Sequence, residues 1–555
     1  MIARGQNFKQ QPINIVGSSV FGRYPKIDIE KTYNMFISDD WLVDYAGYQV
    51  AVPSLGIQGR GIYTSTKFGR MVVVVDANVY LVNIFFDQNL MHSYDTQAIL
   101  IGTLTTSTGV VYITENNKPQ IAISDGVNIY IYDPTLSPVF QIVPGLNFIP
   151  GYIDFHDTYF LCAATQDFST GTTQTNIWRL SGQNDGLTWA SDAASVGTMQ
   201  TKPDNIQAVI RFPSKGNMIL VMGSVVTEAW FDVGYQLFPY QRNDSFNIDY
   251  GCINAATIAR FDELVVWLAG NEKSGPIIMY SDGGMPTKIT TDGIDFLFSQ
   301  LKDPADSQGF IFRQDGHLIY HINFYTDNLS LFYDFNTKRF FHASDENLNY
   351  FIANEVAFFN NQYYFVSKNN GNIYAFDTIF TTYNGAEIPR FRICKQIRLP
   401  SQEYFIVNDL GFTIETGETP GQQEFIGPFY LITQDGQFII TQGNNILFVT
   451  QDGQYILTQD GNNVVSQQFD SNDFDFLIAQ NMDIVYIQPR VDLSISIDGG
   501  ASFGTDFGYI LNPLGQRKNK LLWWQLGLAN DFTPQFKFWG LGRFVATDGI
   551  ANLRQ

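Results

Sequence analysis

The stretch QIAISDGVNIYIYD, residues 120–133, consists of two strand-length apolar runs on either side of an Asp-Gly turn. Ile, Val and Tyr favour strands, and Asp-Gly between two such runs is typical of a hairpin. The same order recurs in RMVVVVDANVYLV (70–82) and QYYFVSKNNGNIYAF (362–376). No stretch of a dozen residues keeps the 3.6-residue period of a helix. The sequence therefore predicts an all-β protein.

The second run of each hairpin belongs to a longer repeat. A polar residue, an aliphatic residue and an aromatic residue, often followed by Asp, recur along the chain with aromatic spacings of 50, 48, 52, 50, 52 and 42. Such spacings suit the four-stranded blades of a β-propeller, which bury their faces by stacking on each other. Chance recurrence of aromatic strands is the alternative. We predict a six- or seven-bladed propeller over residues 58–385, anchored by Tyr80, Tyr130, Trp178, Trp230, Tyr280, Phe332 and Tyr374.

Closing a propeller ring usually requires a strand from an early part of the chain. The N-terminal segment, residues 1–57, is expected to supply it, from either 33–37 or 50–51 beside Pro53. The final interval, from Phe332 to Tyr374, is the shortest of the series, which leaves room for a borrowed strand. Its expected partner is the strand near 362–366.

Beyond residue 385 the sequence pattern changes, and residues 386–555 are predicted to form a β-sandwich-like domain. Its first strand, RFRICKQIR (390–398), contains four cations and is interpreted as an edge-like strand with one charged face. A TQDG repeat at about 427–465 places threonines at positions 433, 441, 450 and 458. Because Asp-Gly favours tight turns, this repeat predicts a β-meander insertion that projects as an appendage.

Signals for catalysis and metal binding are weak. His317 and His321 would share one face of a strand about 13 Å apart, too far for a single metal ion. The three cysteines match no ligand spacing and cannot form a disulfide framework. We predict no catalytic residue, no metal site and no cofactor. A pair of acids that meets only in the folded chain stays open, as a glycosidase would need.

The charge balance limits the partners of the protein. The 555 residues include 33 Lys and Arg against 54 Asp and Glu, a formal net charge of −21. Tight DNA binding depends on cations that neutralise phosphates, so sequence-specific DNA binding is improbable. Residues 1–17 lack the apolar core of a signal peptide, and no run is long enough to span a bilayer. Synthesis and assembly in the cytoplasm are expected.

Blocks at both ends of the chain resemble phage tail proteins. INIVGSSVFGRYPKIDIEKTYNMFISD (13–39) and LVDYAGYQVAVPSLG (42–56) are similar to the opening of such proteins, with Glu30, Thr32, Asn34, Pro53 and Leu55 in the matching places. SISIDGGASFG (494–504) and GQRKNKLLWWQLGLANDFTPQFKFWGLGRFVATDGIANL (515–553) resemble the C-terminal signature of packaged-DNA-stabilisation proteins of short-tailed phages, also called tail accessory or tail hub proteins. In those phage proteins the signature usually contains more arginine around the Trp-x-x-Leu-Gly phrase than this sequence does.

This resemblance implies a non-enzymatic structural virion protein, made and assembled in the host cytoplasm and located in the tail. In well-known relatives six copies form a ring, the hub or nozzle, below the portal and adaptor rings. The ring closes the DNA-filled head, holds tail fibre, spike or needle proteins, and forms part of the ejection channel, through which DNA passes without sequence-specific binding.

A closed ring requires two complementary faces on each subunit. The candidate interface residues are Arg390, Arg392, Lys395, Arg398, Leu521, Leu522, Trp523, Trp524, Phe536 and Phe538. The alternative is that these segments are core strands. Two other functions also stay open, a receptor- or glycan-binding propeller and a carbohydrate-active hydrolase.

Overall fold

The computed structural model describes residues 9–23, 30–87, 92–190, 193–235, 238–400, 402–416, 431–432, 438–442, 447–449, 489–511 and 518–554. Strands dominate this part of the chain, and its one α-helix is α1 (Asp292–Ser299). The predicted all-β class and the β-propeller are confirmed. The propeller and a second region of packed sheets belong to one compact unit, and residues 419–488 with 512–514 belong to another.

Six blades of the propeller are built from consecutive strands. They are β6 (Gly59–Ser65), β7 (Arg70–Val75), β8 (Asn78–Asp87) and β9 (His92–Thr103); β10 (Tyr112–Glu115), β11 (Ile121–Ser124), β12 (Ile129–Tyr132) and β13 (Phe140–Ile142); β14 (Phe148–His156), β15 (Tyr159–Asp167), β16 (Ile177–Leu180) and β17 (Val196–Thr198); β18 (Ile206–Arg211), β19 (Met218–Gly223), β20 (Thr227–Asp232) and β21 (Tyr240–Ile248); β22 (Gly251–Cys252) and β23 (Ala259–Phe261) with β24 (Leu264–Gly270), β25 (Ile277–Ser281) and β26 (Thr287–Lys288); and β27 (Ser307–Gln314), β28 (His317–Phe324), β29 (Leu329–Asp334) and β30 (Arg339–Ala343).

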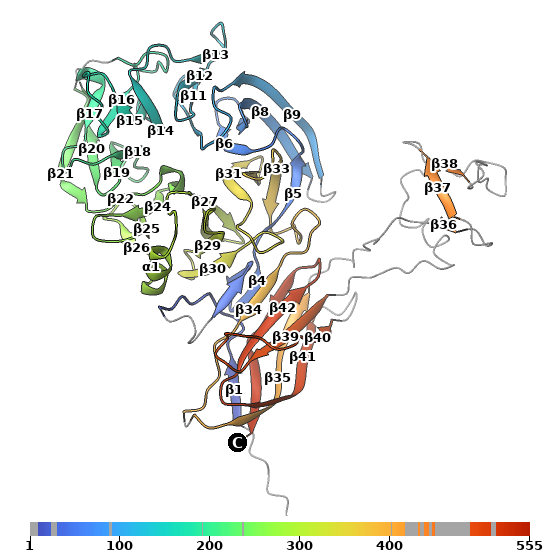
Figure 1. Ribbon diagram of the computed structural model, residues 1–555. Helices are drawn as coiled ribbons and strands as arrows, with labels where there is room; N and C mark the ends of the chain where they lie inside the picture. Colours follow the sequence, from blue (N-terminus) through green and yellow to red (C-terminus); the bar gives the residue numbers. More distant parts are fainter. Residues whose placement is uncertain are drawn as a thin grey trace, which may run out of the picture. The chain divides into compact units, whose positions relative to one another are not determined.

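A seventh blade closes the ring from two distant segments. It contains β31 (Ala353–Phe359), β32 (Gln362–Ser367), β33 (Ile373–Asp377) and, as its outer strand, β5 (Gly47–Val52). The first strands of neighbouring blades pack on one another around a common centre, and β31 packs on β6 to complete the circle (Figure 1). Of the two early segments considered for this closure, 50–51 lies in β5. The expected partner near 362–366 is wrong, because β5 pairs with β33, the next strand outward.

The aromatic anchors of the repeat all lie on the third strand of a blade, from Tyr80 on β8 to Tyr374 on β33. The indoles of Trp178 and Trp230 show how they pack. Their ring centroids are 5.5 Å apart, and Tyr240 from the fourth strand of the next blade lies 5.5 Å from Trp178. At this junction the rings fill the space between two blades, and the position of the anchors on the third strand of each blade explains why the repeat has the length of one blade.

Two packed sheets beyond the propeller form what we call the sandwich region. One sheet contains β1 (Lys9–Ile13), β44 (Gly549–Arg554), β35 (Phe405–Thr416), β43 (Phe544–Ala546), β4 (Trp41–Asp44) and β3 (Met35–Ser38), with β41 (Lys518–Ala529) also paired to β35. The other contains β2 (Lys31–Tyr33), β34 (Arg390–Ile393), β42 (Thr533–Trp539), β39 (Arg490–Ser496) and β40 (Phe507–Ile510).

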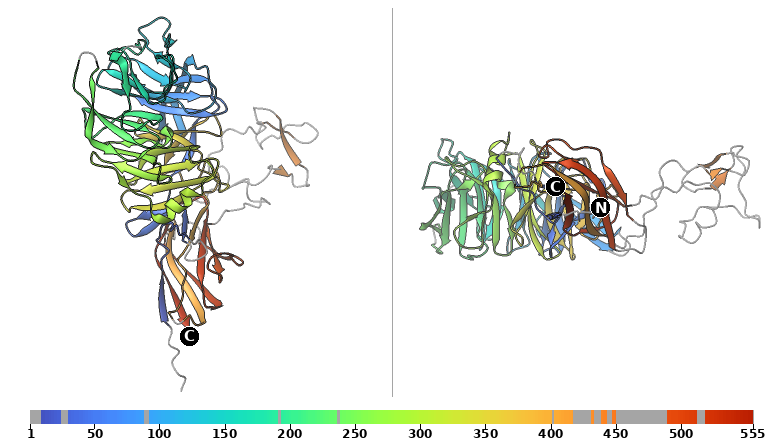
Figure 2. Two further views of the ribbon diagram at one scale, coloured as in Figure 1. Left: turned by 60° about the vertical axis from the view of Figure 1, so that its left-hand side comes forward. Right: turned by 90° about the horizontal axis from the view of Figure 1, so that it is seen from below.

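The sandwich region joins the two ends of the chain. Strands β1 and β44 pair side by side, seen in blue and red in Figure 2. Among the described strands of the N-terminal segment, β5 belongs to a propeller blade, and β1 to β4 belong to the sandwich region. Residues 33–37, the other early segment considered for ring closure, lie in β2 and β3. Strand β2 runs parallel to β30, so the sheet continues from the sixth blade into the sandwich.

The core of the sandwich region is apolar and aromatic. The ring centroid of Phe412, from one sheet, lies 5.0 Å from that of Phe536, from the other, and both side chains are buried. In the insertion, β36 (Leu431–Ile432), β37 (Phe438–Gln442) and β38 (Leu447–Val449) pair in order as an antiparallel sheet, the connectivity expected of a meander. The other residues of the insertion, 427–465, lie outside the described residues.

Candidate functional site

Arg390 is fully buried inside the sandwich region. Its Nε lies 2.9 Å from Oδ1 of Asp44, and its other nitrogens donate to the carbonyls of Gly540 (3.1 Å) and Thr381 (2.9 Å). The guanidinium also lies over the ring of Phe544, 5.2 Å from its centroid. Burial raises the pKa of Asp44, and the nearby arginine opposes that shift. Arg390 therefore connects the chain leaving the last blade to β4 and to the segment before β43.

Arg392 fixes the N-terminal segment in the same sheet. It donates to the carbonyls of Asn14, Ile15 and Ser18 at 2.9–3.1 Å and to Oε2 of Glu30 at 2.5 Å. The side chain is fully buried. A Cβ added to Gly17 would lie 1.9 Å from its Nη2, so only glycine lets the segment pass this closely. The Arg392 side chain thus fixes residues 14–18 next to β34, although these residues are far from it in the sequence.

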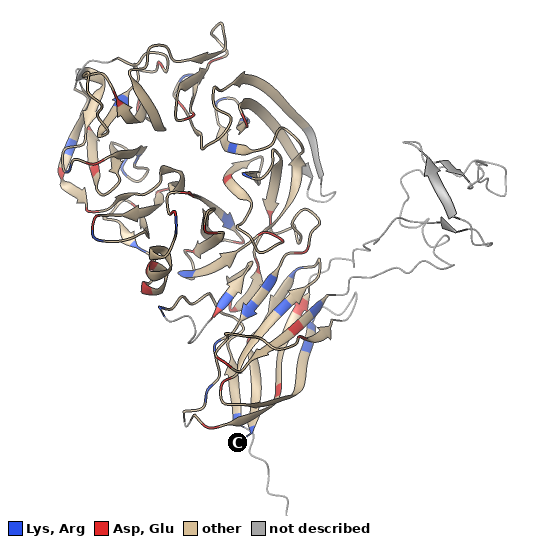
Figure 3. Ribbon diagram, in the orientation of Figure 1, with Lys and Arg blue, Asp and Glu red and all other residues tan. Residues whose placement is uncertain are grey.

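The interpretation of residues 390–398 as an edge-like strand with a charged face is wrong for the strand itself. Strand β34 lies between β2 and β42, and the arginines at 390 and 392 point into the protein. Figure 3 shows the Lys and Arg positions on the central strands of the sandwich region. Their charges are compensated by carboxylates and carbonyls from distant segments, which the local pattern cannot reveal. Lys395 and Arg398 are exposed, and Arg398 pairs with Asp531 at 2.9 Å.

The apolar interface candidates near the C-terminus differ in burial. Leu521, Trp523, Phe536 and Phe538 are buried in the sandwich core, as the core-strand alternative holds. Trp523 donates its indole N–H to the carbonyl of Phe507 at 2.9 Å. Leu522 is half-buried. Trp524 is the exception, with 62% of its surface exposed.

Trp524 belongs to an apolar surface that we call the outer sheet face, made by Ile406, Trp524, Leu528 and Ile550. These side chains are 41–62% exposed. Ile406 lies opposite Leu528 across the β35–β41 ladder, and Trp524 is opposite Asp409 in the same ladder. Ile550 lies on the other side of β35, opposite Gly411. Of these four residues, the sequence predicts only Trp524 as an interface residue, although apolar residues on both faces of β41 were the available signal.

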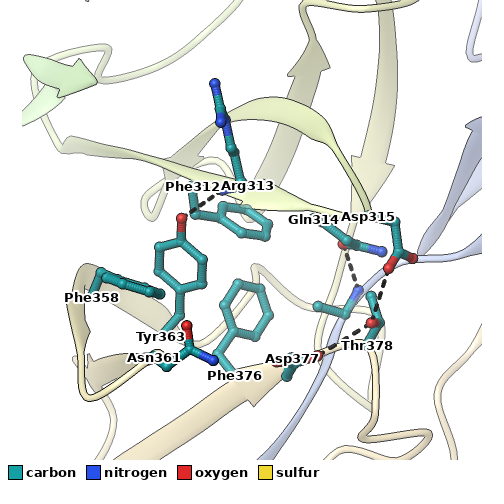
Figure 4. A pocket seen from close by; sticks show the side chains of 11 residues that line it. Phe312, Arg313, Gln314, Asp315, Phe358, Asn361, Tyr363, Phe376, Asp377 and Thr378 are labelled. Atoms are coloured by element: carbon teal, nitrogen blue, oxygen red, sulfur yellow. Dashed lines mark hydrogen bonds between the residues drawn. The ribbon is translucent and has the colours of Figure 1, made fainter. Parts of the chain in front are cut away.

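A pocket of about 240 Å³ lies where the sixth and seventh blades meet (Figure 4). Its aromatic side is lined by Phe312, Phe358, Tyr363 and Phe376, and the Tyr363 hydroxyl accepts from the backbone N–H of Arg313 at 3.1 Å. Its polar side contains two carboxylates, the feature that a hydrolase would require.

Both carboxylates of this pocket are already engaged. Thr378 can donate its hydroxyl to Asp315 (3.3 Å) or Asp377 (3.2 Å), and Asp315 also pairs with Arg543 at 3.1 Å. Asp377 accepts from the backbone N–H of Ile379 as well. A general acid and base need to face a substrate from opposite sides, whereas these two acids flank one threonine hydroxyl. The arrangement stabilises a turn.

His156, His317, His321 and His342 are held by protein groups. His321 is fully buried between the Tyr45 hydroxyl (2.8 Å) and Asn323 (2.9 Å), and burial lowers its pKa to about 3. His317 contacts Asp334 and Ser38. Within the described ranges, no group of three or more His, Cys, Asp or Glu side chains is placed to hold a metal ion. No helix in that part of the chain is long and apolar enough to cross a membrane.

The three cysteines are buried and unreactive. Burial raises the pKa of the thiols of Cys162, Cys252 and Cys394 to about 12. A thiolate is the nucleophilic and metal-binding form, so such thiols serve as small apolar side chains.

Comparison with known proteins gives a family match over the propeller. A family model described as bacteriophage P22 Gp10, beta-propeller, matches residues 46–381. No curated protein gives a significant match. Among solved structures, the N-terminal domain of Nup159 aligns with 9% identity over 62% of this chain and 98% of its own, with a TM-score of 0.37. An ancestral GH74 enzyme aligns with 11% identity over 63% of this chain and 53% of its own, with a TM-score of 0.38.

Proposed function

The chain belongs to the family of the bacteriophage P22 Gp10 β-propeller, and we propose that it is the subunit of a ring, the hub or nozzle of a short phage tail. Its family makes it a structural phage protein and a component of the virion. In the proposed role, several copies, six by analogy with relatives, assemble below the portal and adaptor, close the filled head and form part of the ejection channel. Fibre, spike or needle proteins attach to the ring.

The observation that carries this proposal beyond the family is the outer sheet face. Trp524 and Leu528 are each 62% exposed on a strand whose Leu521 and Trp523 side chains are buried in the sandwich core. Exposed aromatic and aliphatic groups on one sheet face are typical of surfaces that other proteins cover. The face is formed by β35, β41 and β44, within the region where the two ends of the chain are joined by buried arginines. A rigid apolar face of this kind suits contact between subunits.

The net charge supports the channel part of the proposal. Each copy has a formal charge of −21, so a ring would multiply that charge. Passing DNA is repelled by carboxylates and is not retained as it would be by a cationic groove.

Mass photometry and electron microscopy of the full chain, alone and mixed with the portal and adaptor rings, test the proposal. We expect closed rings of wild-type protein and loss of rings in Trp524→Asp with Leu528→Asp. Leu100→Asp is the matched control, because Leu100 is 55% exposed on the propeller strand β9. A wild-type chain that stays monomeric in every mixture, and that binds glycans on an array or cleaves polysaccharide, would contradict the proposal.

A further inference from the structure

A second cavity, of about 200 Å³, lies where the innermost strands of the propeller blades converge. Six of the seven blades contribute to its lining, the exception being the blade of β18–β21. Its polar side chains are Tyr63, Tyr112, Tyr152, Arg260, Gln308 and Glu355. Neither the family match nor the proposed ring assigns a role to this cavity, and its chemistry does not depend on ring assembly.

Glu355 on β31 is the cavity's uncompensated charge. Its Oε2 accepts a hydrogen bond from the backbone N–H of Ile62 at 3.0 Å, on the neighbouring strand β6. No Lys or Arg within the described residues forms an ion pair with it. Burial raises its pKa to about 7, which is the expected response of a carboxylate without a cation nearby. Ionising this carboxylate at neutral pH therefore costs free energy, and a bound cation would lower that cost.

The other charges of the cavity cancel one another. Arg260 pairs with Asp154, whose oxygens also accept from the backbone N–H groups of Phe155 (2.9 Å) and Arg211 (2.8 Å). The Asp154 side chain is 5% exposed and the Arg260 side chain 27%, so the guanidinium lines the cavity while its partner carboxylate lies buried behind it. Arg260 is neutralised by Asp154, which leaves Glu355 as the charged lining residue without an ion-pair partner.

Three tyrosine side chains also line the cavity and provide groups that can contact a cation. The rings of Tyr112 and Tyr152 lie 4.7 Å apart, centroid to centroid. Among the described residues, none hydrogen-bonds to the hydroxyls of Tyr63, Tyr112 or Tyr152, so these oxygens are free to accept. Tyrosine faces attract ammonium groups, and tyrosine oxygens accept their hydrogen bonds.

We propose that this axial cavity binds a primary ammonium group, with Glu355 as its counter-ion and the three tyrosine hydroxyls as acceptors. An anion would be repelled by the carboxylate, and a neutral polyol would leave its charge uncompensated. The volume is below that of drug-sized pockets and suits a group of a few atoms. The ammonium can come from a free aliphatic amine or from a lysine side chain of a partner.

Calorimetric titration of the full-length protein with n-butylammonium and with Nα-acetyl-lysine amide separates these sources. We expect at least one of them to bind, whereas n-butanol, the neutral analogue, does not. Binding of butylammonium alone identifies a free amine, and binding of the lysine derivative identifies a lysine side chain. Failure of both, or equal binding of n-butanol, would overturn the proposal.

Variants test the assigned contacts. Glu355→Gln keeps an oxygen for the Ile62 N–H and is expected to fold, yet to weaken amine binding at least tenfold. Tyr152→Phe preserves the ring and is expected to weaken binding severalfold. Glu346→Gln is the matched control, because Glu346 is exposed outside the cavity and should leave affinity unchanged. Lowering the pH from 8 to 5.5 should weaken binding to the wild type and not to Glu355→Gln. Unchanged affinity in Glu355→Gln would refute the assignment.

Discussion

Both the propeller and the sandwich region consist of β-strands joined by turns. They differ in how far apart in the sequence the contacting residues lie. Six blades are formed by strands that follow one another in the chain, and nearly all of these strands pair with a neighbour in sequence. In the sandwich region, β1 pairs with β44, and the backbone N–H of Val16 donates to Asp548 across 532 residues. The propeller repeats one local unit, whereas the sandwich depends on a few long-range contacts. Its stability should therefore depend on single residues that connect distant segments.

The sharpest test of this comparison is Arg392→Ala. The substitution leaves the half-buried Glu30 without its cation and removes the donors to three backbone carbonyls. We expect a loss of roughly 5 kcal/mol or more in the free energy of unfolding of the sandwich region. Denaturant unfolding followed by hydrogen exchange of β1 and β34 measures it. Lys395→Ala, at an exposed position nearby, should change stability little, and equal effects of the two variants would contradict the comparison.

The corresponding test of the propeller is Trp230→Ala. The indole is 5% exposed and packs on Trp178 of the preceding blade, so its removal leaves a cavity between two blades. We expect a loss of about 3–5 kcal/mol, measured by thermal and denaturant unfolding. Trp524→Ala removes an equally large side chain from an exposed position and is expected to cost less than about 0.5 kcal/mol. An unchanged melting temperature in Trp230→Ala would contradict the packing of blade on blade.

Acid affects two buried histidines of the sixth blade. Burial lowers the pKa of His321 and His342 to about 3, and their pKa in the unfolded chain is about 6.5. Between these values the unfolded chain binds more protons, so stability falls as the pH falls below about 6.5. At pH 5 we expect a loss of roughly 2 kcal/mol for each histidine.

The difference between wild type and His321→Gln isolates one of these two contributions. The loss of unfolding free energy from pH 7 to pH 5 should be smaller in the variant by the amount assigned to one histidine. Identical pH dependence of the two proteins would show that His321 has the same pKa in the folded and the unfolded chain, which would contradict its burial as a neutral side chain.

The smallest effect is expected from removal of the insertion. Residues 419–488 belong to a separate compact unit from the propeller and the sandwich region. Replacing residues 427–465 with a short Gly-Ser linker should change the melting temperature of the remaining chain by no more than about 2 °C, since all the replaced residues belong to the smaller unit. Loss of soluble expression would show that the insertion supports the sandwich after all.

Sequence reasoning succeeded where contacts are local. The blade-length repeat could be recognised because the hairpin turns and the aromatic residues both lie within single blades. Ring closure by an early strand was also anticipated, but the pairing of β5 with β33 was not, because a single short strand fits several partners equally well. At the candidate site, Trp524 was named, while Ile406, Leu528 and Ile550 were missed because alternation alone does not say which face is covered.

The all-β class, the propeller repeat and the lack of an obvious reactive motif could be read from the amino-acid sequence, because hairpins and packing aromatics are encoded over short distances. Whether the cations in residues 390–398 are buried or exposed was decided by the tertiary structure. An arginine is stable inside a protein only when acceptors surround it, and those of Arg390 and Arg392 come from segments at the two ends of the chain. The same long-range folding places Glu355 beside three tyrosines from three other blades.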